Sequence, residues 1–218
     1  RLAIAPEPLC VLETTPETTA VFRTLFERAD ADGILEPAQR HLGVGYDVGD
    51  ETVEFEDVAQ SIRDLRAAEV RISKVHITCA IRLESPETNR DGRSALADFA
   101  EPRYLHQVFG RSADGRIVHR TDLDRALCES PSEKFLFADE WRIHFHVPVN
   151  AERIGPLLTT RDDLKRALKA VAELDYAPHL EVETYTWHVL PGEQQPSLVD
   201  GLTAELQATR DLLAGIAG

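Results

Sequence analysis

The 218-residue sequence contains no methionine, only three cysteines and no long apolar run. Cys10, Cys79 and Cys128 are too few and too scattered for a disulfide framework or a cysteine-rich zinc site. They are more typical of small buried apolar residues in a reducing compartment. No segment approaches the roughly 18 apolar residues of a membrane span, and no signal-peptide pattern opens the chain. We therefore expect a cytoplasmic protein that does not insert into a membrane.

Several motifs of known chemistry are missing as well. The chain has neither glycine pattern that binds nucleotides, GxGxxG or GxxxxGK[ST], and it lacks the GxSxG elbow of serine hydrolases. Lys and Arg total 24 against 38 Asp and Glu, which gives a formal net charge of −14. Because nucleic-acid binding depends on clustered basic side chains, this balance argues against a DNA or RNA partner.

Strand-like and helix-like segments alternate along the chain, as apolar residues recur with a period of two or of about 3.6. The predicted strands are 2–8, 41–47, 71–81, 141–149 and 179–190. The predicted helices are 16–29 (capped by Thr15), 55–70, 121–130 (capped by Thr121), 160–174 and 197–214. Residues 85–98 are expected to form a loop, and 103–120 a hairpin with its turn at 113–115. We expect one domain, 1–218, with 99–120 as an inserted hairpin.

This alternation favours βαβ units and a parallel sheet, either doubly wound or closed into a barrel. An acidic or imidazole side chain stands near the carboxyl end of every predicted strand, where the active-site groups of barrels gather. These five residues are Glu7, Asp47, His76, His146 and Glu183. We therefore expect an α/β TIM (β/α)8 barrel. Five units are found, where a barrel has eight in about 250 residues, so the chain is expected to hold the C-terminal five. Open sheet edges would then favour association between copies.

Each of these residues also has a simpler interpretation. Glu7 could be a surface carboxylate, Asp47 could cap the next helix, and a lone His76 in mid-strand is more often a core residue than a ligand. The pair Glu181 and Glu183 is harder to explain, because burying two carboxylates on one face is costly unless they are paired or bind a cation. A cluster of such groups binds a metal or has strongly shifted pKa values. Mixed carboxylate and imidazole ligands suit Mn²⁺, Zn²⁺, Fe²⁺ or Co²⁺ better than Ca²⁺.

The segment "WRIHFHVP" (141–148) places Arg142, His144 and His146 on one face of a strand. An edge strand with a solvated face is the simpler interpretation, and a polar barrel interior that holds a metal is the other. His146, nearer the carboxyl end, is the expected metal or substrate contact. Arg142 and His144 are expected to lie deeper, where they orient ligands or pair with Glu181.

Six strings resemble the EboE family of metabolite traffic proteins, within the xylose-isomerase-like TIM barrels. They are "PEPLCVLETT" (6–15), "YDVGDETVEFED" (46–57), "EPRYLHQV" (101–108), "WRIHFHVPV" (141–149), "LLTTRDDL" (157–164) and "HLEVETYTWHVLP" (179–191). The resemblance implies a barrel with a divalent metal at its mouth and a bacterial gene set that moves or tailors a prenylated metabolite. It assigns the metal to Glu7, Asp47, His76 and Glu183. In one branch of the superfamily the Asp belongs to a D-x-x-H motif, and Asp50 stands here in place of that His.

The expected function is a metal-dependent isomerase or epimerase that acts on a sugar, a sugar phosphate or a cyclitol-like polyol. The metal would polarise a carbonyl group while Glu7 or Glu183 moves a proton at the neighbouring carbon. The expected substrate contacts are His106, Arg142, His144 and Glu181. The alternative is a protein of the same fold that binds a metabolite without converting it. A DNA-repair endonuclease is disfavoured by the acidic charge.

Overall fold

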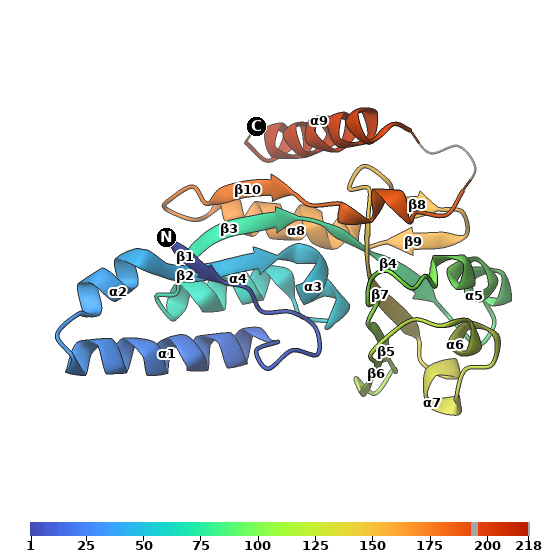
Figure 1. Ribbon diagram of the computed structural model, residues 1–218, viewed down its shortest axis with the longest axis horizontal. Coiled ribbons are helices and arrows are strands. Elements are labelled where there is room, and N and C mark those ends of the chain that lie inside the picture. The colour runs from blue at the N-terminus through green and yellow to red at the C-terminus, as the bar shows by residue number, and fades with distance from the viewer. Residues whose placement is uncertain (193–195, 218) are drawn as a thin grey trace.

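The computed structural model describes residues 1–192 and 196–217, which form a mixed α/β fold with one parallel and one antiparallel sheet (Figure 1). The parallel sheet has the strand order β1 (Leu2–Ile4), β2 (Leu42–Asp47), β3 (Ile72–Ile77) and β10 (His179–Val182). The order of the strands in this sheet is therefore their order along the chain, with the strands of the second sheet inserted between β3 and β10. Within the described residues the sheet does not close into a barrel, and β1 and β10 are its edges.

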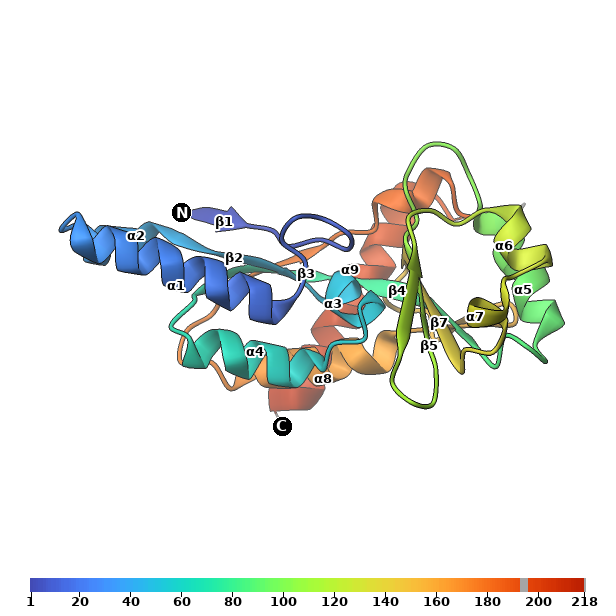
Figure 2. The same cartoon turned by 90° about the horizontal axis from the view of Figure 1, so that it is seen from below.

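Four helices accompany the parallel sheet, and each contacts the next. They are α1 (Thr15–Ala31), α4 (Val58–Ala67), α8 (Arg161–Ala172) and α9 (Leu198–Ala217). Figure 2 shows α4 and α8 together on one side of the strands. Because side chains alternate across a strand, Tyr46, Val75 and Ile77 are buried in the core while His76 and Glu181 belong to the opposite, polar face.

The second sheet has the order β6-β5-β7-β4-β9-β8, and all its pairs are antiparallel. Its strands are β4 (Cys79–Glu84), β5 (Val108–Arg111), β6 (Ile117–Arg120), β7 (Glu140–Val147), β8 (Arg153–Ile154) and β9 (Leu157–Thr159). Segment 141–149 is thus a strand, as predicted. The prediction that it continues the parallel sheet is wrong, because β7 pairs with β4 and β5.

The break between the two sheets lies inside the strand predicted at 71–81. Only Thr78 separates β3 from β4, and the chain runs through it from one sheet into the other (Figure 1). The Thr78 hydroxyl donates to Asp47 Oδ1 at 2.5 Å and accepts from the Gly49 amide at 2.7 Å. A Cβ on Gly49 would stand 2.9 Å from this hydroxyl, so the close approach requires glycine.

The remaining elements are short. They are α2 (Leu35–His41), α3 (Val48–Val53), α5 (Arg90–Leu96), α6 (Arg125–Glu129), α7 (Glu133–Leu136) and the 3₁₀ helices η1 (Ala97–Phe99) and η2 (Tyr185–His188). The loop predicted at 85–98 is wrong at α5, because the Asn89 side chain caps a helix there by accepting from the Gly92 amide at 2.9 Å. The strand predicted at 179–190 ends at Val182, and η2 follows.

Two predicted helix caps are displaced, the first by one residue and the second by three. Thr14, and not Thr15, caps α1, where Glu17 completes a capping box. Asp124, and not Thr121, caps α6 by accepting from the Leu127 amide at 2.7 Å.

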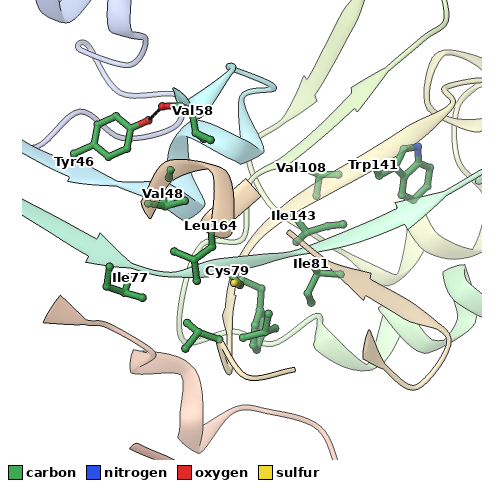
Figure 3. Close-up of a cluster of buried hydrophobic side chains, with 14 of the residues drawn as sticks. Tyr46, Val48, Val58, Ile77, Cys79, Ile81, Val108, Trp141, Ile143 and Leu164 are labelled. Carbon is green, nitrogen blue, oxygen red and sulfur yellow. Dashed lines mark hydrogen bonds between the residues drawn. The ribbon is translucent and has the colours of Figure 1, made fainter. Parts of the chain in front are cut away.

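One hydrophobic cluster contains residues of both sheets. Figure 3 shows it extending from Tyr46 and Ile77 in the parallel sheet to Ile143 and Trp141 in the antiparallel sheet, with Cys79 between them. Cys79 and Cys128 are buried as predicted, whereas Cys10 is exposed. Among the described residues, none of the helices combines the length and the apolar character that crossing a membrane requires.

Candidate metal centre

Among the described residues, two groups of three potential metal ligands lie between the parallel sheet and β7. The first group is Asp47, His76 and Glu183, and the second group is Asp50, His144 and His146. Within each group, one ligand atom from every residue lies within 4.8 Å of the other two. The register explains the first group, since β2 pairs Asp47 with His76 and β10 ends one residue before Glu183.

Asp47 uses its two carboxylate oxygens for two purposes. Oδ1 accepts from the amides of Gly49 at 2.7 Å and Asp50 at 3.1 Å, so Asp47 is the N-cap of α3. Oδ2 lies 3.1 Å from His76 Nδ1. The capping role and the site role, which are alternatives at the level of sequence, therefore coexist in one side chain.

His76 lies between two carboxylates, because its Nδ1 is 3.1 Å from Asp47 Oδ2 and 2.5 Å from Glu183 Oε2. Burial lowers the pKa of His76, but the hydrogen bonds that it donates to the Asp47 and Glu183 carboxylates, together with their charges, outweigh burial and raise this pKa to about 10. Burial raises the pKa of Asp47, but the hydrogen bonds from His76 and Thr78, together with the charges of His146 and His76, lower it below its usual value, so this carboxyl stays ionised. The first group thus behaves as a compact negative site that attracts a cation.

The second group joins the first turn of α3 to β7. His144 Nε2 lies 2.9 Å from Asp50 Oδ1 and 3.3 Å from His146 Nε2. All three residues are buried, at 2 to 8 % exposure. Burial and the neighbouring charge of Asp47 raise the pKa of Asp50 well above its usual range, and burial lowers the pKa of His144.

The far side of each imidazole in the second group is held by an oxygen acceptor. His144 Nδ1 lies 2.8 Å from Gln107 Oε1, and His146 Nδ1 lies 2.6 Å from the Glu183 carbonyl oxygen. Gln107 is itself oriented, because its Nε2 donates to the Pro8 carbonyl at 3.2 Å. This arrangement matches the outer hydrogen bonds that fix metal-binding histidines.

Aromatic rings cover the second group. The Tyr185 ring centroid is 4.6 Å from that of His146 and 5.0 Å from that of Tyr104. Burial raises the pKa of Tyr185, and the charge of Asp50 adds to this effect, so the phenol stays neutral. The wall beside the ligands is therefore apolar and aromatic on one side.

The other residues predicted for the site lie outside both groups. Glu7 is exposed on the loop between β1 and α1, and Glu181 pairs with Lys74 at 3.0 Å. Both ring nitrogens of the buried His106 are used, Nδ1 with the His144 carbonyl at 3.0 Å and Nε2 with Glu101 at 2.9 Å.

Arg142 is also committed to protein partners. Its Nε lies 2.6 Å from Glu140 Oε1, and its Nη1 donates to the Thr52 carbonyl at 2.6 Å. Arg142 and His106 are thus bound to protein partners, and they support β7.

The sequence-based prediction gave His144 a role in orienting ligands or contacting substrate and noted Asp50 in place of a motif histidine, but it named neither as a metal ligand. It also missed Gln107 and Thr78 as supports of the two groups. The sequence did contain a signal for Asp50. Residues 47 and 50 are three apart, and a short helix makes the side chains of such residues neighbours on its surface. The helix α3 itself was not predicted. Comparison with protein-family models, curated protein sequences and solved structures found no match for this chain.

Proposed function

We propose that the protein is a divalent-metal-dependent isomerase or epimerase that acts on a sugar or cyclitol-like polyol. The observation that carries this proposal is the first group, in which Asp47, His76 and Glu183 meet at the carboxyl ends of neighbouring parallel strands. Two carboxylates and one imidazole suit Mn²⁺, Zn²⁺, Fe²⁺ or Co²⁺. The proposal includes membership of the EboE family, for which the quoted strings are the support.

A bound metal would supply Lewis-acid polarisation of a substrate carbonyl. The side chains of the protein would hold the ion in place and move the proton. Asp47 and His76 are held by strand pairing and by the α3 cap, so they would fix the position of the ion. Glu183 has a side chain that is 35 % exposed, and Glu7 lies on an exposed loop, so both carboxylates are open to a ligand. Either could take a proton from the carbon next to the carbonyl and return it.

The finer fold proposal is a (β/α)8 barrel of which the parallel sheet is one part. The order β1-β2-β3-β10 supports it, because a doubly wound sheet reverses its strand order at a switch point and this one does not. The row of helices on one face and the polar residues on the other also agree with a barrel wall. Reading the gene upstream of Arg1 for further strand–helix units tests this part.

A binding protein without catalysis is the second candidate, and one observation favours it. Both carboxylates of the first group already satisfy His76 Nδ1, so the group forms a stable ion pair with a proton in place of a metal. Such a site would hold the hydroxyls of a polyol without turning it over. The aromatic rings of Tyr185 and Tyr104 suit the apolar face of a sugar or cyclitol ring equally well in both cases.

Solvent hydrogen exchange separates the two candidates. The protein loaded with Mn²⁺ would be incubated in D₂O with fructose, a ketose phosphate and a keto-inositol, and deuterium at carbon measured by mass spectrometry. An isomerase or epimerase incorporates deuterium next to the carbonyl, and Asp47→Asn abolishes this uptake while Glu181→Gln retains it. A polyol that binds to the protein but takes up no deuterium would leave the binding protein as the answer.

A further inference from the structure

We propose that Asp50, His144 and His146 form a second metal site, which binds a divalent transition ion such as Zn²⁺. This site goes beyond the proposed function, since it stands whether or not the first group supports isomerisation. It rests on three observations, namely the direction of the ring nitrogens, the spacing of the ligand atoms and their burial.

The hydrogen bonds of the two histidines determine which nitrogen faces inward as an acceptor. The Pro8 carbonyl can only accept, so Gln107 turns its NH₂ group toward Pro8 and its Oε1 toward His144. His144 Nδ1 therefore carries the hydrogen. The Glu183 carbonyl imposes the same choice on His146. A ring that carries this one hydrogen offers a lone pair at Nε2, and the two Nε2 atoms lie 3.3 Å apart.

The ligand spacing matches a shared ion. Two nitrogens bound to one Zn²⁺ at about 2.0–2.1 Å stand roughly 2.9–3.4 Å apart, depending on the bond angle. The observed separations are 3.3 Å between the two Nε2 atoms and 2.9 Å from His144 Nε2 to Asp50 Oδ1. A third acceptor, the carboxylate, thus completes a set of two imidazoles and one carboxylate.

Burial favours a shared cation in this group. When Asp50 is ionised, its carboxylate and the two lone pairs are 90 % or more removed from water, and they repel one another unless a positive charge lies among them. One proton on His144 Nε2 has to be shared between Asp50 Oδ1 at 2.9 Å and His146 Nε2 at 3.3 Å, whereas a metal ion binds all three atoms at once. Two imidazoles and one carboxylate favour Zn²⁺ or Fe²⁺ over Mg²⁺ and Ca²⁺, which prefer oxygen ligands.

Metal titration of variants provides the test. After removal of metal with a chelator, the protein is titrated with Zn²⁺ by calorimetry and with Co²⁺ by visible absorption. The wild-type protein is expected to bind two ions per chain. His144→Asn should weaken the binding of one ion by more than about 100-fold. The removal of a group that only supports a ligand costs up to about 100-fold, and the loss of a ligand itself should cost more. Asp47→Asn should weaken the other, and the exposed His119→Asn should change neither.

Different results point to different failures. If the wild-type protein binds one ion, and this ion is lost in His144→Asn but retained in Asp47→Asn, the result supports this site and contradicts the metal of the proposed function. Binding that is unchanged in His144→Asn overturns the second site. A measurement on the wild-type protein covers the case in which the variant does not fold, because Co²⁺ bound here shifts the Nδ1–H resonances of His144 and His146 far outside the normal proton NMR range. Absence of both shifted signals at saturating Co²⁺ overturns the proposal.

Discussion

His146 donates a hydrogen bond of 2.6 Å from its Nδ1 to the backbone carbonyl of Glu183. The carboxylate of the same Glu183 lies 2.5 Å from His76 in the first group, so one residue belongs to one group through its side chain and supports the other through its backbone. The contact also joins the ends of β7 and β10, which come from different sheets. Any shift of residue 183 therefore moves both groups.

This double role predicts that Glu183→Gln affects the two groups unequally. The substitution removes a charged ligand from the first group and should weaken its metal binding by at least about tenfold. The backbone carbonyl remains, so the second group should keep its affinity. Calorimetric titration of both ions measures the difference. Glu181→Gln is the matched control, because Glu181 lies two residues away, pairs with Lys74 and should leave both affinities unchanged. Equal weakening of both ions would contradict the separate roles of the side chain and the backbone.

Arg142 is expected to contribute to stability and not to ligand binding. Its guanidinium lies 2.6 Å from Glu140 and 3.4 Å from Asp163, and the side chain is 9 % exposed. Arg142→Leu removes one partner from each of these buried carboxylates and should lower the free energy of unfolding by about 3 kcal/mol. This value is the lower end of the range for a broken buried ion pair, because Arg82 still pairs with Glu140 and Arg166 still pairs with Asp163.

Urea unfolding measures the stability of Arg142→Leu, and metal titration of the folded protein should match wild type. Arg63→Leu on the exposed side of α4 should stay within about 0.5 kcal/mol. A stable Arg142 variant with weakened ligand binding would restore the substrate role that the sequence suggested.

Much of the local structure follows from the sequence, because helix and strand periodicity depends on neighbouring residues. The positions of β2, β7, α4 and α8 agree with the predicted segments to within a few residues. The pairing partner of β7 could not be derived in this way. Residues 71–81 read as one uninterrupted strand, and only the tertiary bonds of Thr78 to Asp47 and Gly49 show where the chain leaves the parallel sheet.

The candidate site was predictable where it depends on strand ends. Asp47, His76 and Glu183 were expected together, and the structure brings them together, since parallel strands place their carboxyl ends along one edge. The contact of His144 with Asp50 depends on α3, which carries Asp50 and whose six residues have no long periodic pattern. Arg142 and His106 looked like site residues because they are polar in an apolar context, but their partners, Glu140 and Glu101, are also in the protein.

The packing of α9 predicts opposite effects for two glycines of the same helix. A Cβ on Gly201 would stand 2.5 Å from the buried Trp187 ring, whereas none of the described residues lies within 4 Å of the Cβ position of Gly215. Gly201→Ala should therefore destabilise the protein by about 1–3 kcal/mol through overpacking. Gly215→Ala should be neutral or stabilise it by up to about 1 kcal/mol through helix propensity. Thermal unfolding of the two variants measures both changes, and a similar shift in both would show that α9 does not press on Trp187.

Glu205 of α9 connects this helix to the candidate metal centre through Trp187 and Thr184. This fully buried carboxylate accepts from Trp187 Nε1 at 3.1 Å and from the Thr184 hydroxyl at 2.5 Å. Because Thr184 directly follows Glu183, a displaced α9 should loosen the first group as well. Gly201→Ala is therefore expected to weaken metal binding by the first group, and Gly215→Ala to leave it unchanged.

Glu54 predicts a loss of stability at alkaline pH. Both of its carboxyl oxygens are buried without a hydrogen-bond partner among the described residues, and burial, with the charges of Glu13 and Asp50, raises its pKa from 4.5 to about 9. Between these values the folded state holds a proton that the unfolded state releases. The contribution of Glu54 is therefore fully present below pH 4.5 and is lost as the pH rises through about 9.

Glu54→Gln keeps the shape of the side chain and removes this titration. With a chelator present, the variant should match wild type to within about 1 kcal/mol near pH 5, since both side chains are neutral there. It should become more stable than wild type as the pH approaches 9. Urea unfolding at pH 5, 7 and 9 measures the two slopes. Glu36→Gln on α2, whose side chain is 77 % exposed, is the control and should follow the wild-type slope. Parallel slopes for Glu54→Gln and wild type would mean that Glu54 is ionised in the folded protein, and a buried cation or water would then have to compensate it.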